Sequence, residues 1–190
     1  TRTENGGKGA AVMDGLRQAQ LLGFSHALQI DADGQHRSAD LPRFLDAARD
    51  NPNALITGTP QYDASVPKGR LYGRYLTHVW VWINTLSLDI RDSMCGFRVY
   101  PPASTLAIIN RAALGKRMEF DCEILVRLHW QGSPIINLPT AVQYPENGLS
   151  HFRMLKDNLL ISKMHARLFF GMLVRLPWIL QRRISGRRQT

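Results

Sequence analysis

An acidic loop that directly follows a short apolar run is the feature that most constrains this chain of 190 residues. Residues 26–30 read as a buried strand, and Asp31 and Asp33 come immediately after it. In open α/β sheets, ligands bind beyond the carboxyl ends of the strands. Two carboxylates separated by one residue can both approach a hard cation there, and Mg²⁺ or Mn²⁺ prefers such oxygen ligands. The loop therefore predicts a metal site formed by Asp31, Asp33 and Gln35, the alternative being an Asx turn with helix-capping acids.

Helical and strand-like segments alternate along the rest of the chain. Hydrophobic periodicity predicts helices over residues 9–22, from 40 onward, 70–88, 119–130 and 152–174. Short apolar runs predict strands over residues 26–30, 54–57, 97–100, 135–138 and 141–144. This alternation is typical of an α/β fold with a mostly parallel sheet flanked by helices.

A glycine-rich loop with one lysine precedes the first predicted helix. Its sequence is Asn5-Gly6-Gly7-Lys8-Gly9. Glycines let backbone N–H groups approach a phosphate, and the helix N-terminus adds positive potential. Lys8 is therefore a candidate phosphate ligand, although the same sequence also suits a flexible loop.

Positive charge is concentrated at the C-terminal end. The formal net charge is +9, and residues 151–190 carry nine Lys or Arg against one acid, Asp157. Such a basic end indicates an anionic partner, and an anionic membrane is favoured over nucleic acid because no base-reading motif accompanies the charge. The apolar stretch there is too short and interrupted to span a bilayer. We therefore expect residues 151–190 to form a basic amphipathic tail that attaches peripherally to a membrane. With two cysteines outside any CxxC pair, the expected location is the cytoplasmic, inner face of the plasma membrane.

Three motifs in this order resemble family-2 glycosyltransferases with the GT-A fold, above all the polyprenyl-phosphate mannose and glucose synthases. They are the Asn5–Gly9 loop, Asp31-Ala32-Asp33-Gly34-Gln35-His36, and Asp92 followed by Cys95-Gly96-Phe97-Arg98, and the resemblance covers residues 1–150. It implies an inverting transferase that takes its sugar from a UDP- or GDP-linked donor with Mg²⁺ or Mn²⁺. Asp31, Asp33 and Gln35 would then hold the metal and the donor diphosphate. The further ligands of the donor or its phosphates would be Lys8, Arg70, Arg74 and Arg98, and Gly96 and Phe97 would lie toward the acceptor.

Two departures from that family's pattern shape the expected function. The family begins with a strand and a loop that bind the base and ribose, and neither is present, so residues 1–150 correspond to a partial GT-A domain. The family's phosphate-binding Arg-x-x-Gly-x-Ser-Lys is represented by residues 145–151, with Pro145 and His151 replacing the two basic residues. This change favours a hydroxyl over a phosphate on the lipid-type acceptor.

A hydroxyl acceptor needs a general base. Asp92 is the first candidate and Glu123 the second, the alternatives being a loop cap and a solvated helix face. A non-catalytic, transferase-like module that binds a membrane or a partner through its basic end is the rival hypothesis for the whole chain.

Overall fold

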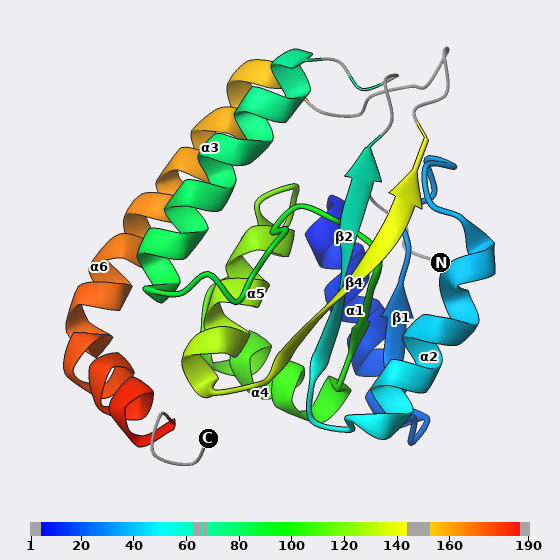
Figure 1. Ribbon diagram of the computed structural model, residues 1–190, viewed down its shortest axis with the longest axis horizontal. Helices are drawn as coiled ribbons and strands as arrows, with labels where there is room; N and C mark the ends of the chain where they lie inside the picture. Colours follow the sequence, from blue (N-terminus) through cyan, green and yellow to red (C-terminus); the bar gives the residue numbers. More distant parts are fainter. Residues whose placement is uncertain (1–4, 63–65, 67, 144–152, 187–190) are drawn as a thin grey trace.

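The computed structural model describes residues 5–62, 66, 68–143 and 153–186. A four-stranded sheet in the order β1-β3-β2-β4 lies at its centre (Figure 1). The strands are β1 (Ala27–Gln29), β2 (Leu55–Tyr62), β3 (Arg98–Tyr100) and β4 (Ile135–Val142). The predicted α/β class is confirmed.

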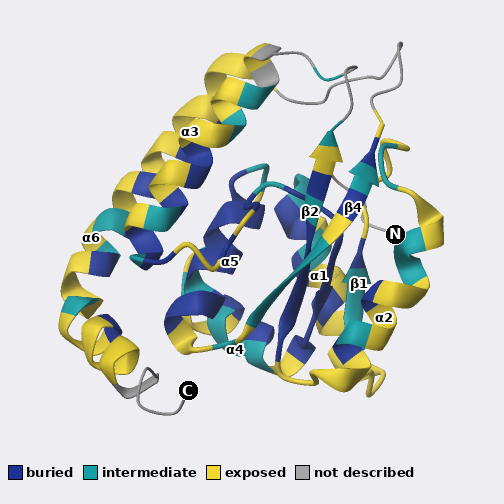
Figure 2. Cartoon of the chain, in the orientation of Figure 1, coloured by how far each residue is buried: buried dark blue, intermediate teal, exposed yellow. Residues whose placement is uncertain are grey.

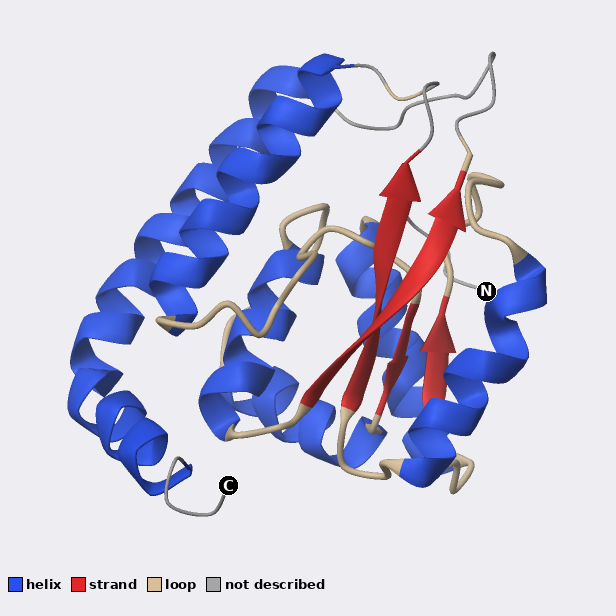
Figure 3. Ribbon diagram, in the orientation of Figure 1, coloured by secondary structure: helices blue, strands red, loops and turns tan. Residues whose placement is uncertain are grey.

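Helices cover both faces of the sheet (Figure 3). A 3₁₀ turn (Ser38–Asp40) leads into α2 (Leu41–Asp50), which packs on one face, where Phe44 and Phe97 stack with centroids 4.0 Å apart. The opposite face carries α1 (Lys8–Leu21), α4 (Pro102–Arg111) and α5 (Phe120–Gln131). Two longer helices, α3 (Lys68–Thr85) and α6 (Met154–Gly186), pack side by side against α5.

Most strands of the described sheet run in one direction, as predicted, and β3 is the exception. The strands β2 and β4 are parallel, whereas β3 runs antiparallel to both β1 and β2. The antiparallel direction of β3 follows from the path of residues 86–97. These residues return along α3 toward the start of that helix, and Asp92 there pairs with Arg74 of α3. The chain therefore enters β3 from the end at which β2 leaves the sheet.

Two proline positions behave differently from the sequence-based prediction. Residues 135–138 and 141–144 were expected as separate strands around Pro139, but β4 runs through this proline, which lies opposite Thr59. A proline is tolerated there because β4 is an edge strand of the described sheet. The pair Pro101-Pro102, expected only to stop a strand, also begins α4, because a proline is well suited to the first turn of a helix.

The basic C-terminal segment is one long helix that shares the main hydrophobic core. Predicted over residues 152–174, α6 extends past Pro177 to residue 186. Met164, Leu168 and Met172 are buried in the same cluster as the apolar side chains of α5. The predicted boundary at residue 150 thus separates two parts that pack together. In the described part of the chain, every helix is too short or too polar to cross a membrane.

Candidate functional site

The acidic loop of residues 31–36 crosses the end of the sheet from one edge to the other. It leaves β1, and at its far end the N–H of Gln143 donates to the carbonyl of Gln35 (3.2 Å) while His36 forms a bridge with Val142 of β4. The His36 ring packs against Phe97, with centroids 5.5 Å apart. Burial lowers the pKa of His36, although Asp31 and Asp33 oppose the shift. The loop therefore lies beyond the carboxyl ends of three strands, as expected for a ligand site.

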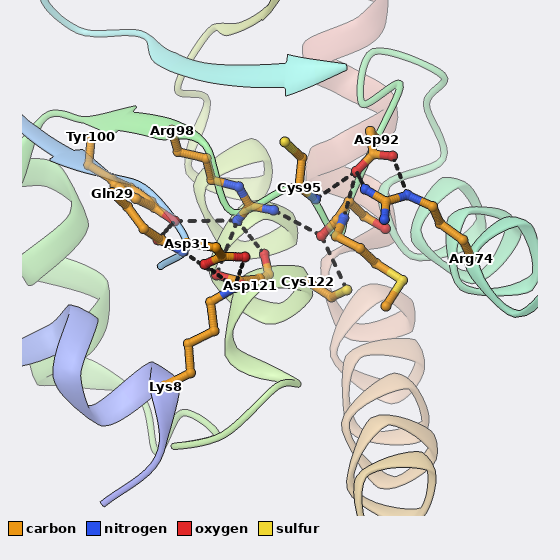
Figure 4. A network of polar contacts seen from close by, with 12 residues as sticks. Lys8, Gln29, Asp31, Arg74, Asp92, Cys95, Arg98, Tyr100, Asp121 and Cys122 are labelled. Atoms are coloured by element: carbon orange, nitrogen blue, oxygen red, sulfur yellow. Dashed lines mark hydrogen bonds and ion pairs between the residues drawn. The ribbon is translucent and has the colours of Figure 1, made fainter. Parts of the chain in front are cut away.

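Lys8 joins two carboxylates that are distant in sequence (Figure 4). Its Nζ lies 2.7 and 2.8 Å from the two oxygens of Asp31 and 2.6 Å from Oδ2 of Asp121. Burial alone would lower the pKa of Lys8, but the charges of Asp121 and Asp31 raise it overall, so the amine remains an ammonium ion. Lys8, the predicted phosphate ligand, thus lies beside Asp31, the predicted metal ligand. Asp121, which sequence reasoning missed, holds Lys8 in this position.

Gly96 makes room for the Asp31 side chain. A Cβ atom built on Gly96 would overlap the carboxylate of Asp31. The glycine of the Gly-Phe-Arg motif therefore has a steric role at the acidic loop and lies beside the predicted metal ligand Asp31, while its predicted position toward the acceptor stays a prediction.

The carboxylate oxygens of Asp31 and Asp33 suit a hard cation whose remaining ligands are water or phosphate oxygens. Asp31 is partly exposed and already accommodates one cation, the Lys8 ammonium. Asp33 is exposed, and its Oδ1 accepts the N–H of Gln35 (3.1 Å), which is the Asx turn considered as the alternative. Within the described residues, no group of three His, Cys, Asp or Glu side chains converges on one point. Such oxygens fit Mg²⁺ or Mn²⁺ held by one or two carboxylates together with phosphate and water.

The expected general base Asp92 is a buried partner of Arg74. Two charge-assisted bonds join them, from Arg74 Nε to Oδ2 (2.6 Å) and from Nη2 to Oδ1 (2.7 Å). His78, also missed by sequence reasoning, lies with Nε2 3.2 Å from Oδ2. Burial would raise the pKa of Asp92, but the hydrogen bond from His78 and the charge of Arg74 hold it well below its usual range. The carboxylate is therefore a weak base, which counts against the predicted role.

Glu123, the second candidate base, connects α5 to α6. It is fully buried; Arg127 donates to Oε1 (2.8 and 2.9 Å), and Arg167 of α6 donates to Oε2 (2.7 Å). The backbone N–H of Gly115 also donates to Oε2 (2.9 Å). The alternative considered for Glu123, a solvated helix face, is wrong because α6 covers this side of α5, and the arrangement favours a structural role for Glu123 over that of a base.

Arg98 and Phe97 lie inside the protein. Arg98 is fully buried and donates to the carbonyls of Asp121 (2.7 Å) and Ser93 (2.9 Å), so its predicted contact with phosphate is not supported. Phe97, predicted on the acceptor side, belongs to the core under α2. Gln29 completes this network by donating to Asp121 (3.1 Å) and accepting from Tyr100 (2.9 Å).

Several predicted elements have no described geometry. The side chain of Arg70 and residues 145–151, which correspond to the family's phosphate-binding motif, lie outside the described residues. The cysteines are described and buried, and burial raises the pKa of both the Cys95 and Cys122 thiols to about 12, so neither is a thiolate at neutral pH.

The chain belongs to glycosyl transferase family 2, whose model matches residues 1–117. It is 28% identical to an undecaprenyl-phosphate mannosyltransferase of Micrococcus luteus, over 78% of this chain and 62% of that protein. It is 26% identical to a polyprenol monophosphomannose synthase of Mycolicibacterium smegmatis, over 78% of this chain and 57% of that one. The chain thus spans about three fifths of the length of these curated relatives.

A solved structure supports the fold. Glucosyl-3-phosphoglycerate synthase from Mycobacterium tuberculosis, in complex with uridine diphosphate, matches with a TM-score of 0.59 over 90% of this chain and 56% of that one. The two sequences are 12% identical, so this likeness concerns the fold alone, which is the GT-A glycosyltransferase fold that the motifs predict.

Proposed function

We propose that this chain is the catalytic part of a transferase that moves a sugar from a nucleotide-sugar donor to a polyprenyl phosphate at a membrane surface. Membership of family 2 and the names of the relatives support the reaction class. One observation favours a phosphate over a hydroxyl as the acceptor group. Asp92 and Glu123, the two carboxylates that were candidates for a base, are buried and held by arginines.

This arrangement reverses the preference for a hydroxyl acceptor. An alcohol must lose a proton as it attacks, whereas a lipid phosphate is already an anionic nucleophile and needs no base. Direct displacement at the anomeric carbon by the phosphate oxygen would invert that carbon. Arg74, partly exposed at the rim of the site, could orient an incoming phosphate while Asp92 holds its guanidinium.

The donor side is built around the acidic loop. Asp31 and Asp33, with the Gln35 amide, would hold a divalent cation, which would neutralise the charge that develops on the departing diphosphate. Lys8 lies at the same carboxylate and would add a second positive charge for the phosphates.

The lipid acceptor also fits the surface formed by α3 and α6, here called the α3–α6 face. Both helices have an exposed side opposite their buried one (Figure 2), and many residues on it are apolar. The exposed apolar residues on α3 include Tyr72, Tyr75, Leu76, Val79 and Ile83. Those on α6 include Leu155, Leu159, Phe170, Leu173, Leu180 and Ile184, and Lys156 and Lys163 are exposed on the same helix. Exposed aromatic and apolar residues together with lysines suit helices that lie in an anionic head-group layer.

A transfer assay with paired acceptors tests the proposal. The intact protein is incubated with Mg²⁺ or Mn²⁺, a panel of labelled UDP- and GDP-sugars, and either a polyprenyl phosphate or the matching polyprenol. We expect label in the lipid fraction only with the phosphate, and no transfer after chelation of the metal. Transfer to the alcohol at a similar rate would overturn the choice of acceptor. No transfer to either lipid from any donor would favour the non-catalytic hypothesis.

A further inference from the structure

Lys8 occupies a position that resembles a cation site. Three carboxylate oxygens, two from Asp31 and one from Asp121, surround its Nζ at 2.6–2.8 Å. These three residues come from different elements, since Lys8 begins α1, Asp31 follows β1 and Asp121 lies in the first turn of α5. The fold therefore brings two carboxylates to one point and neutralises them with an ammonium ion of the same chain.

A divalent cation and this ammonium ion would compete for Asp31. Both oxygens of Asp31 are within hydrogen-bond distance of Nζ, so a metal that binds this carboxylate meets the ammonium ion at the same oxygens. Two positive charges a few ångströms apart would also repel each other strongly in a partly buried site. We therefore expect metal binding at Asp31 to displace Lys8.

The two carboxylates differ in how firmly they are placed. The side chain of Asp31 is 24% exposed and that of Asp121 is 5% exposed. Asp121 also accepts a hydrogen bond from Gln29 (3.1 Å) and lies 3.9 Å from the Arg98 guanidinium. Asp31 is consequently the accessible partner, and Asp121 is the fixed one that can retain Lys8.

We propose that Lys8 is a displaceable counter-ion, which neutralises Asp31 until a divalent cation takes that carboxylate, and that Asp121 is the positioning residue that keeps the released ammonium beside the site. This inference rests on the proposed metal role of Asp31. It assigns Asp121 an effect on metal affinity that acts through Lys8 and requires no contact between Asp121 and the metal.

Metal binding without nucleotide tests this idea on the purified chain. Free Mn²⁺ is measured by electron paramagnetic resonance during titration of the wild type, Lys8→Met, Asp121→Asn and the double variant. Lys8→Met should bind Mn²⁺ about tenfold more tightly or better, because the competing charge is gone. Asp121→Asn should bind it several-fold more weakly, since Lys8 then has Asp31 as its remaining carboxylate partner. Arg17→Met removes the same charge from an exposed site on α1 and should leave Mn²⁺ affinity unchanged.

The double variant separates this mechanism from simpler ones. If Asp121 acts through Lys8, Asp121→Asn should have no further effect on Mn²⁺ affinity once Lys8 is Met. A further loss in that background would mean that Asp121 binds the metal itself and would overturn the proposal. The double variant also avoids leaving Asp121 without the charge of Lys8, and thermal unfolding by circular dichroism checks that each variant is folded.

The Mn²⁺ titrations test the counter-ion proposal separately from the proposed transferase function. An unchanged Mn²⁺ affinity in folded Lys8→Met overturns the counter-ion proposal even when the intact protein transfers sugar in a metal-dependent way. Conversely, the expected affinities in a protein that transfers no sugar would support the counter-ion and count against the transferase.

Discussion

At the scale of single residues, the carboxylates singled out by the sequence differ mainly in their partners. Asp31 faces a lysine, Asp92 an arginine and a histidine, and Glu123 two arginines. Asp33 is exposed and caps its own loop. The hydrogen bond from His78 and the charge of Arg74 hold the pKa of Asp92 well below its usual range, so this carboxylate does not readily accept a proton. From these partners we expect Asp31 and Asp33 to bind ligands, and Asp92 and Glu123 to support the structure around them.

Substitution of Gly96 tests the steric role of this residue at the acidic loop. Gly96 is not among the residues with positive φ, so Gly96→Ala is compatible with the backbone, but the added Cβ would displace the Asp31 carboxylate. We expect Mn²⁺ affinity and transfer to fall about tenfold or more while the unfolding temperature changes little. Mn²⁺ titration measures the affinity, the transfer assay measures the rate, and circular dichroism measures the unfolding temperature.

Gly15→Ala provides the matched control, because a Cβ on this helical glycine of α1 meets open space. It should leave both the affinity and the transfer rate unchanged. Normal Mn²⁺ binding by folded Gly96→Ala would instead show that the position of Asp31 against Gly96 is unimportant.

At the scale of elements, the contact between α3 and α6 contains a buried histidine. The Nδ2 group of Asn84 on α3 donates to Nδ1 of His165 on α6 (3.3 Å), and Trp80 lies against the same imidazole ring, with centroids 6.1 Å apart. Within the described part of the chain, Nε2 of His165 has no hydrogen-bond partner. Burial lowers the pKa of His165 to about 4 because a charged imidazolium would lose its hydration there.

This histidine predicts that the pair of helices loosens in mild acid. The unfolded chain binds a proton at His165 near pH 6.5, and the folded protein does so only near pH 4. Between these values the unfolded state holds more protons, so the free energy of unfolding falls as the pH falls. The loss attributable to His165 should total about 3 kcal/mol over this window. Urea unfolding at pH 7 and at intervals down to pH 4 measures it.

His165→Gln supplies the control because glutamine is polar and does not titrate. Other groups contribute equally to both proteins, so the difference between their unfolding free energies isolates His165. Stability profiles that remain parallel from pH 7 to pH 4 would contradict the prediction.

Sequence periodicity identified most elements but not the ones that depend on tertiary context. The predicted helix over residues 9–22 is observed as Lys8–Leu21, and that over 119–130 as Phe120–Gln131, because their apolar spacing matches the core they pack against. The antiparallel direction of β3 depends on the path of a long loop, which no local pattern encodes. Likewise, the effect of Pro139 depends on whether its strand lies at an edge.

At the scale of the whole molecule, the candidate site combines residues that are distant in the chain. The acidic loop and Lys8 were recognisable because a motif marks them. Asp121 and His78 were not, since a lone acid in the first turn of a helix and a lone histidine on an aromatic-rich helix have many ordinary uses. The role of Asp121 follows from its contact with Lys8, more than a hundred residues away in the chain. The role of His78 follows from its contact with Asp92, which a long loop brings back to α3.

The α3–α6 face predicts a salt-sensitive attachment of the whole protein to anionic bilayers. Each Lys or Arg near such a surface contributes about 1 kcal/mol. Lys156→Gln with Lys163→Gln should therefore weaken binding to anionic vesicles roughly 30-fold at low salt. Replacing Leu159, Phe170 and Leu173 with Ser should reduce the part of the binding that persists in high salt. Co-sedimentation with anionic and neutral vesicles measures both effects.

A charge-matched control comes from other faces of the molecule. Arg17→Gln with Arg49→Gln removes the same charge from exposed positions on α1 and α2 and should leave vesicle binding unchanged at high salt and nearly so at low salt. Equal loss of binding in the two double variants would mean that net charge, and not the α3–α6 face, is responsible.

The parallel pairing of β2 with β4 has a consequence for how the protein is made. Leu55 pairs with Ile135, so this ladder cannot begin until all the residues between them, α3 among them, have been synthesised. Loop closure over such a distance is costly, and non-local pairing of this kind folds slowly. During that interval α3 is complete while α6, which covers its inner side, is still in the ribosome. We therefore expect the nascent chain to present an aromatic, apolar helix early, and to benefit from a chaperone or a nearby bilayer until α6 has been synthesised.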